Sequence, residues 1–255
     1  MMGLLVRDVA GLPAEVNRSV LGTLGFSVAD VAAFAFFTAA WLLYHYAVER
    51  SAAGPGSLNR VMNLQRYAWM RALLTRDNRI VDSNINASLQ NGTAFFASTA
   101  LLAIGGSVTL LRSADEVVTL FAQLPFGLAT TRLAWDAKVL GLTVIFVYAF
   151  FKFAWSYRLF NYAAILIGAV PERGVGPPEE AEAAAWRAAS MNTVAGRHFN
   201  RGQRAFFFAL AYLGWFISAY VLIATTAFVL YVMWHRQFAS DALASLSRGP
   251  WPESR

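Results

Sequence analysis

The sequence predicts an all-α fold: a polytopic membrane protein with four transmembrane helices and additional interfacial amphipathic helices. Four apolar stretches reach or nearly reach the ~20 helical residues needed to cross a hydrocarbon core about 30 Å thick. They cover residues 28–48, 93–111, 139–157 and 206–234. The composition agrees, since 57% of the residues are hydrophobic and 14% are charged. Soluble domains carry about 25% charged residues.

The four spans and their connections use nearly all 255 residues, so we expect a single membrane domain over 1–255. The chain has no cysteine, which excludes disulfides, zinc–thiolate sites, iron–sulfur clusters and cysteine nucleophiles. Residues 1–27 hold Asp8 and Glu15 and lack the compact apolar core of a secretory signal. We therefore expect the first span itself to insert the chain.

The net charge of +6 comes mostly from arginines beside apolar spans, a pattern typical of contact with lipid headgroups rather than nucleic acid. The connections after the first and third spans carry eleven basic residues, against eight on the other face. The positive-inside rule therefore predicts that these connections face the cytoplasm of a cell inner (plasma) membrane. Four spans would place both termini together on the non-cytoplasmic side.

The first span ends in a polar group at its inner end. His45 and Glu49 lie one helical turn apart, with Trp41 one turn deeper on the same face. His45 could be hydrogen-bonded between helices, carry protons, or serve as a ligand, for example to heme. Asp30, at the outer start of the span, is predicted to cap the helix or mark its end.

Residues 58–74 predict a helix lying on the membrane, after a turn at 54–56. At 100° per residue, the apolar side chains, including Trp69, fall on one arc and the polar ones on the other. An arginine-rich face opposite a tryptophan is typical of an interfacial helix, and packing against the bundle is a compatible alternative. The polar arc holds Asn59, Arg60, Asn63, Arg66 and Arg71.

The second span carries a stripe of small residues, Thr99, Ala103 and Ser107, at every fourth position. Such a stripe permits close helix contact, either inside the bundle or at a subunit interface. The segment that follows, 114–128, predicts a short external helix and then a turn at Pro125.

The third span is expected to continue as a helix to residue 170 and to stop at Pro171. It contains Lys152, about 20 Å from Lys138 along the helix. Three roles for Lys152 are open: snorkelling to the interface, a structural ion pair, or contact with a substrate or ion. After Pro177 and Pro178, residues 179–195 predict a second interfacial helix, and the fourth span is long enough to tilt or protrude.

Polar residues near the inner interface form the candidate site, although nothing in them offers a nucleophile–base pair, a metal-binding spacing or a phosphate-binding loop. We therefore expect neither an enzyme nor a cofactor, metal or catalytic residue. The run 76–82, with two arginines and two aspartates, is its densest part. The members of the predicted cluster are His45, Glu49, Asp77, Arg79, Asp82, Lys152, Arg158, Asn161 and Arg204.

Several stretches of the sequence are distinctive: 76–82 (RDNRIVD), 95–100 (FFASTA), 145–153 (IFVYAFFKF), 161–162 with 167–169, and 199–206 (FNRGQRAF). They resemble the domain of unknown function 599 family of bacterial and plant membrane proteins. The resemblance covers roughly residues 41–240. The resemblance implies a four-helix membrane fold and carries no established activity or catalytic residues. The chain departs from the family at 84–90, which is more polar than such proteins usually are there.

Three classes of function compete. The first is a structural or accessory protein that self-associates or joins a larger membrane complex; aromatic-rich spans and the small-residue stripe favour it. The second is a homo-oligomeric channel or transporter, in which the inner arginines and lysine would form a basic vestibule. The third, an enzyme acting on a lipid or quinone, has only His45 in its favour. The expected partners are the lipid bilayer and other copies or subunits, not nucleic acid.

Overall fold

A computed structural model describes residues 25–50, 56–123 and 131–247, and these contain helices and no strand. The all-α prediction is confirmed. Four described helices are long and apolar enough to cross a membrane: α3 (Val28–Glu49), α5 (Ile80–Arg112), α7 (Arg132–Gly168) and α9 (Ala219–Phe238), the last counted together with the segment up to Leu246. The remaining elements are α4 (Leu58–Leu73), α6 (Ala114–Gln123), α8 (Pro178–Tyr212), the 3₁₀ turn η2 (Leu213–Phe216) and α10 (Asp241–Ser247).

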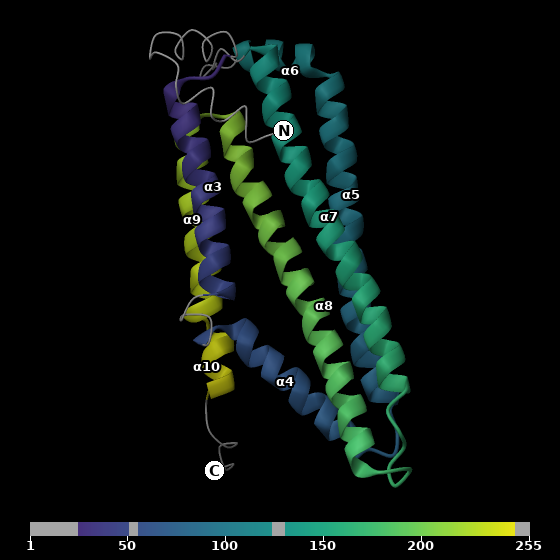
Figure 1. Cartoon of the computed structure of the whole chain (residues 1–255). Helices are drawn as coiled ribbons and strands as arrows, with labels where there is room; N and C mark the ends of the chain where they lie inside the picture. The colour runs from purple at the N-terminus through teal and green to yellow at the C-terminus, as the bar shows by residue number, and fades with distance from the viewer. Residues whose placement is uncertain (1–24, 51–55, 124–130, 248–255) are drawn as a thin grey trace, which may run out of the picture.

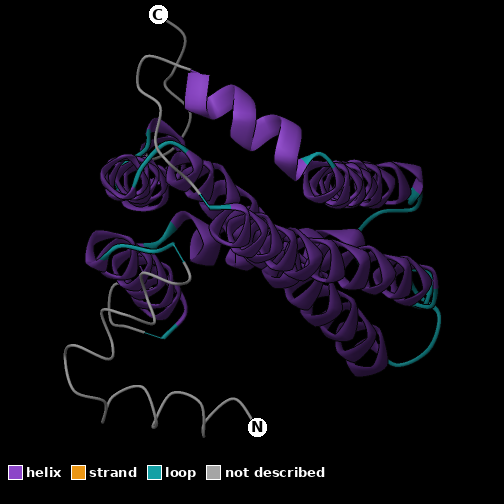
Figure 2. Cartoon of the chain, turned by 90° about the horizontal axis from the view of Figure 1, so that it is seen from above, coloured by secondary structure: helices purple, strands orange, loops and turns teal. Residues whose placement is uncertain are grey.

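The long helices form an elongated bundle whose two ends we call upper, where α3 begins, and lower, where α4 lies (Figure 1). The chain descends in α3, rises in α5, descends in α7, rises in α8 and descends in α9. Figure 2 views these helices nearly end-on and shows α6 lying crosswise over the upper end. The crosswise α6 agrees with the short external helix predicted at the start of 114–128.

Side-chain contacts fix the directions of the helices. At the upper end, Trp215 donates a hydrogen bond to Asp30 at 2.7 Å; at the lower end, Tyr44 donates one to the Met233 carbonyl at 3.0 Å. Helices α3 and α9 therefore run in parallel. Asp30 acts as predicted, since it forms a capping box with Ser27 at the start of α3.

Helix α8 is the centre of the bundle. Its C-terminal half is enclosed by its neighbours, and Ala205, Phe208, Ala209 and Tyr212 are almost entirely buried. Because protein rather than lipid covers this half, it needs no continuous apolar surface. This explains why α8 runs the length of the bundle without the composition of a membrane span.

The predicted fourth span, 206–234, is not one helix. The chain ends α8 at Tyr212, turns through η2 and starts α9 at Ala219, where Ser218 caps the new helix by accepting from Val221 N at 3.1 Å. Gly214 permits the reversal, because a Cβ there would lie 3.0 Å from the Val221 carbonyl oxygen. The turn consists of apolar residues, so a hydropathy profile does not distinguish it from the helices on either side. As a consequence, the start of α3 and the end of α9 lie at opposite ends of the bundle (Figure 1).

Two other predicted boundaries differ from those observed. Residues 179–195 do not form a separate interfacial helix, because they are the first half of the continuous α8, which starts at Pro178 with Glu179 in its first turn. Helix α5 begins at Ile80, thirteen residues before the predicted second span. The third span behaves as expected, since α7 continues to Gly168. Helices α5, α7 and α8 thus project together beyond the lower end of α3.

Helix α4 has nearly the predicted bounds, but its predicted polar arc lies partly against the protein. Arg66, expected on an outward face, donates to Asn192 of α8 at 2.9 Å and lies against Gly196. Met62 and Leu64 are exposed, as is Arg60 of the polar arc. Arg66 turns inward because α8 presents an amide and a glycine at its level, whereas farther along α4 the side chains of Met70 and Leu73 pack in one cluster with alanines of α8. Part of the predicted turn at 54–56, the predicted turn at Pro125 and the predictions for residues 1–24 lie outside the described residues.

Candidate functional site

The structure divides the predicted polar cluster into separate places. His45, Glu49 and Arg204 meet at the lower end of α3, close to Arg201, which was not predicted. Of the other predicted residues, Asp77, Arg79 and Asp82 lie in a junction between α4, α5 and α7, and Asn161 lies between α5 and α7. Lys152 and Arg158 also belong to α7. Asp77 and Arg79 border a polar cavity whose described lining holds three arginines and two carboxylates, whereas the first group borders a cavity with a larger surplus of arginine.

Glu49 is held by two arginines of α8. Arg201 Nε donates to both carboxylate oxygens of Glu49, at 2.9 and 3.1 Å, and Arg204 contacts the same carboxylate. Only 7% of the Arg204 side chain is exposed. His45 Nδ1 lies 3.6 Å from Glu49, so the predicted pair on one face of α3 is confirmed as a contact. Glu49 raises the pKa of Arg201, so this cation keeps its charge at every physiological pH.

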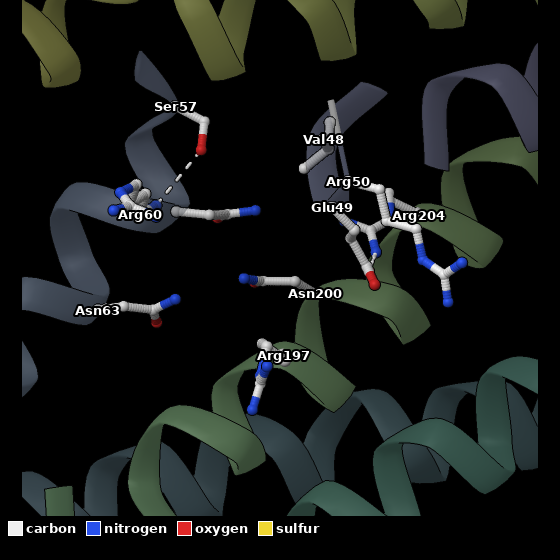
Figure 3. Close-up of a pocket in the computed structure, with 10 residues that line it drawn as sticks. Val48, Glu49, Arg50, Ser57, Arg60, Asn63, Arg197, Asn200 and Arg204 are labelled. Atoms are coloured by element: carbon white, nitrogen blue, oxygen red, sulfur yellow. Dashed lines mark hydrogen bonds and ion pairs between the residues drawn. The ribbon is translucent and has the colours of Figure 1, made fainter. Parts of the chain in front are cut away.

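A cavity of about 400 Å³ opens beside this group, between the end of α3, the start of α4 and the middle of α8 (Figure 3). Arginine and asparagine side chains from the three helices line it, and Figure 3 shows several of them converging on its open centre. Its lining consists of Val48, Glu49, Arg50, Ser57, Asn59, Arg60, Asn63, Arg197, Asn200 and Arg204. We call this cavity the basic pocket.

The basic pocket carries a surplus of positive charge. Among the described residues, four arginines line it and Glu49 is the only carboxylate. Among the ion pairs of the described residues, none involves Arg50, Arg60 or Arg197. Guanidinium groups offer several N–H donors in a plane and match the oxygens of phosphate or carboxylate. The pocket therefore has the chemistry of an anion-binding site.

Helical spacing aims these groups at one space. Arg197, Asn200 and Arg204 follow at positions i, i+3 and i+7, which lie on one face of α8. The start of α4 contributes Asn59 and Asn63, after Ser57 caps the helix by accepting from Arg60 N at 3.4 Å. The pocket forms where α4 leaves the end of α3 and crosses to α8.

Aromatic rings close the bundle above the pocket. Trp41 of α3 stacks on Phe208 of α8 with ring centroids 5.3 Å apart, and Phe37 meets Phe208 edge-on one turn higher. Phe208 is fully buried. This layer separates the basic pocket from the upper half of the bundle, so within one chain the pocket is a dead-end site.

Lys152 belongs to α7 and is not among the residues that line the basic pocket. Its ammonium group sits over the Tyr148 ring, 5.1 Å from the centroid, and it forms no ion pair with any described residue. The structural ion pair considered for Lys152 is therefore not found among those residues. Its charge acts on His198, whose pKa is lowered first by burial and then by Lys152.

The run 76–82 forms a structural junction. Asp82 is completely buried, accepts from Trp69 Nε1 of α4 at 2.7 Å and pairs with Arg76. Arg79 donates to the Pro171 carbonyl at 2.6 Å and to the Val170 carbonyl, and so completes the C-terminal end of α7. Asp77 forms an exposed pair with Arg173 at 3.7 Å. The predicted members Asp77, Arg79 and Asp82 thus join α4, α5 and α7 rather than border the basic pocket.

The last two predicted members are also separate from the pocket. Arg158 donates to the Tyr162 hydroxyl at 2.8 Å on the surface of α7. Asn161 accepts from Gln90 Nε2 of α5 at 2.7 Å. The polar segment 84–90 therefore has partners on α7 and α8, including a bond from Asn86 to the Phe160 carbonyl at 3.2 Å.

Sequence reasoning missed the inward positions of two cations. Lys138 is 7% exposed and donates to the Trp215 carbonyl at 3.0 Å, completing the end of η2. Arg66 is desolvated between α4 and α8, which lowers its pKa. Arg201 could have been selected from the sequence, because it lies about one helical turn before Arg204. Its pairing with Glu49 could not, because the two residues are 152 positions apart.

The small-residue stripe of α5 packs inside the bundle at two of its three positions. Ser107 is buried, and Ala103 packs against the main core. This supports internal packing, one of the two roles predicted for the stripe.

Fold and site together define a helical membrane protein with a basic pocket at one end of its bundle. The family described as "Protein of unknown function, DUF599" matches over residues 32–242. The chain belongs to this family, which confirms the resemblance seen in its motifs. No curated protein and no solved structure matches the chain.

Proposed function

We propose that this integral membrane protein is a non-enzymatic accessory protein that binds an anionic group in the basic pocket. The observation that carries the proposal is the excess of arginine around one cavity: four guanidinium groups face a single carboxylate. Amide groups of Asn59, Asn63 and Asn200 add neutral donors. A negatively charged ligand would compensate the surplus positive charge of the described residues.

The ligand chemistry that fits is a phosphate or a phosphate ester. Arginine forks bind such groups through two parallel hydrogen bonds, each stronger than a neutral one. The pocket lies beside the end of an apolar helix, which is the level of lipid headgroups. Two sources share this chemistry, a phospholipid headgroup and a phosphate compound in solution.

The proposal includes an orientation. The eleven basic residues of the first and third connections all belong to the lower half of the structure, whereas Arg112, Arg132 and Lys138 belong to its upper end. The positive-inside rule then favours a cytoplasmic lower end in an inner (plasma) membrane. The basic pocket would open on the side where anionic lipids and phosphate compounds are both available.

Binding by the purified full-length protein in an uncharged detergent tests the proposal. Isothermal titration with short-chain phosphatidic acid, and separately with inorganic phosphate, distinguishes the lipid source from the free one. The double variant Arg60→Gln, Arg197→Gln removes two unpaired guanidinium groups and should weaken binding about tenfold or more. Arg187→Gln on the same helix is the matched control, because Arg187 is exposed and does not line the pocket.

Two results would count against an anion site. The wild-type protein would bind neither probe, or Arg187→Gln would weaken binding as much as the double variant. Added salt should also weaken binding, because exposed charges are screened within about 10 Å at 0.1 M ionic strength. Affinity that is independent of salt would contradict recognition by charge.

Self-association or attachment to a larger complex remains part of the accessory proposal. Native extraction from membranes followed by mass determination of the intact particle tests it. A particle with the mass of one chain and its lipids would contradict this part alone.

A homo-oligomeric channel with a basic vestibule is the second candidate, and the basic pocket is the observation that favours it. Since aromatic rings close the pocket within one chain, the pore would have to lie between subunits. Anion flux into proteoliposomes, compared for wild type and Lys152→Met, tests this candidate. Equal and background-level flux for both proteins would exclude it.

A further inference from the structure

The basic pocket has a small side chamber that extends toward α9. Asn59, Asn200 and Arg204 line both spaces, so the two lie side by side. The chamber holds about 50 Å³, room for one or two groups the size of a water molecule. Its further polar lining comes from Gln203, Arg236 and Gln237.

Gln237 is the informative residue of this chamber. It is 8% exposed, and its side-chain Nε2 is a fully buried donor without a hydrogen-bond partner among the described residues. Leaving a buried amide donor unsatisfied costs free energy, so native proteins rarely keep one without a use. The donor points to a missing acceptor in the chamber.

Neighbouring side chains are committed elsewhere. The Tyr44 hydroxyl donates to the Met233 carbonyl at 3.0 Å. The Arg236 guanidinium lies over the Phe207 ring, 5.2 Å from its centroid. Amide side chains and two arginines therefore line the chamber. Such a lining suits a neutral group that can both accept and donate hydrogen bonds.

A hydroxyl group meets these requirements. It accepts from an amide N–H and donates to an amide oxygen, and it fits a space of this size. A second phosphate would be too large for the chamber, and an apolar group would leave Gln237 unsatisfied.

We infer that the basic pocket and its chamber form one site for a phosphate ester with a hydroxylated substituent, such as a glycerol phosphate headgroup. The phosphate occupies the basic pocket, and a hydroxyl of the substituent accepts from Gln237. This inference rests on the proposed anion binding and specifies the ligand of the same site.

Ligand pairs with and without a glycerol substituent on the phosphate provide the test. The full-length protein in uncharged detergent is titrated with short-chain phosphatidylglycerol and phosphatidic acid, and with glycerol 3-phosphate and inorganic phosphate. We expect the glycerol-bearing member of a pair to bind about three- to tenfold more tightly. A preference seen only in the lipid pair assigns the site to lipid, and one seen only in the soluble pair assigns it to a free phosphate ester.

Gln237→Leu should abolish this preference while leaving the affinity for phosphatidic acid and inorganic phosphate within twofold. Gln65→Leu, at an exposed position of α4, is the matched control and should keep the preference. Gln237→Glu, close in shape to the native side chain, replaces the donor with an acceptor and should also lose the preference. It serves as the second variant if Gln237→Leu folds poorly.

The outcomes separate this inference from the function on which it rests. Equal binding of both members of each pair by the wild-type protein, unchanged in Gln237→Leu, would overturn the hydroxyl subsite and leave the anion site standing. Absence of binding to all four probes would overturn both.

Discussion

At the scale of single residues, glycines decide how closely the central helices approach. Gly202 of α8 faces the ring of Phe153 in α7, and a Cβ there would lie 2.7 Å from the ring. The ring is fully buried and packed between Phe96 and Phe199, with centroid distances of 5.4 and 5.7 Å. It has no space into which it can move. Gly105 of α5, by contrast, has open space around it.

Gly202→Ala should therefore destabilise the protein by about 1–3 kcal/mol through overpacking, despite the higher helix propensity of alanine. Gly105→Ala should be neutral or stabilising by up to about 1 kcal/mol. Equilibrium unfolding in mixed micelles, followed by circular dichroism, measures both. Similar destabilisation by the two substitutions would contradict the contact with Phe153.

The pH dependence of stability is also set at residue scale. Burial and the charges of Lys152, Arg201 and Arg197 lower the pKa of His198 below its usual 6.5, with Glu49 opposing them. The unfolded chain therefore takes up a proton before the folded protein as the pH falls. The contribution of His198 to stability is complete above pH 6.5 and is lost as the pH drops through the folded pKa.

We expect the melting temperature to decrease between about pH 7 and about pH 5, and His198→Gln to flatten this decrease. Differential scanning fluorimetry in uncharged detergent measures the profiles. His235→Gln, at an exposed position, is the control and should follow the wild type. A wild-type slope retained in full by His198→Gln would refute the assignment.

At the scale of elements, the run 76–82 explains how two long helices and α4 are joined. Asn78 caps the start of α5 by accepting from Ile80 N at 2.9 Å, while Arg79 completes the end of α7. Asp82 connects α5 to Trp69 of α4. These contacts with neighbouring elements account for the density of charge in the run.

Arg79→Met should lower the unfolding free energy by about 1–3 kcal/mol, because the last carbonyls of α7 lose their charged donor. Arg173→Met removes a nearby arginine whose pair with Asp77 is largely exposed, with side-chain exposures of 66% and 86%. That variant should change stability by less than about 1 kcal/mol. Unfolding under the same micellar conditions compares the two, and an equal loss would show that the carbonyl contacts of Arg79 contribute nothing.

At the scale of the whole molecule, five helices run between the upper and lower ends, although four have the composition of a membrane span. Helix α8 is the additional one, and it lies in the centre. An odd number of passages separates Ser27, before α3, from Ser240, after α9. The bundle therefore predicts that these two positions face opposite sides of the membrane.

Impermeant maleimide labelling of single-cysteine variants tests this topology, and the absence of native cysteines makes it direct. Val28→Cys and Glu116→Cys should be modified from one side, and Glu172→Cys and Asp241→Cys from the other, which we expect to be the cytoplasm. Labelling of Val28→Cys and Asp241→Cys from the same side would restore the four-span arrangement.

Much of the fold could be predicted from local pattern. Apolar runs identified α3, α5, α7 and the region of α9. Charged side chains are costly in lipid, so a membrane-spanning segment is recognisable from its local composition. The bounds of α4, the extension of α7 to Gly168 and the start of α8 at Pro178 followed from periodicity and helix-ending residues. The division of 206–234 left no such signal, since the reversal at Gly214 is as apolar as the helices that it joins.

The candidate site was predictable only in part. His45, Glu49 and Arg204 were singled out by charge near an interface, but Arg50, Arg60 and Arg197 join them only because α4 crosses from α3 to α8. Asp82 and Arg79 were singled out by the same criterion and turned out to be structural.

The amino-acid sequence by itself determined that this is a helical membrane protein of its family, because hydrophobicity and helix ends are local properties. Tertiary structure alone decided which charges face one another, which side chains of α4 face α8 and at which end of the bundle α9 finishes. Those depend on contacts between residues more than a hundred positions apart, such as Glu49 with Arg201, and no local pattern encodes them.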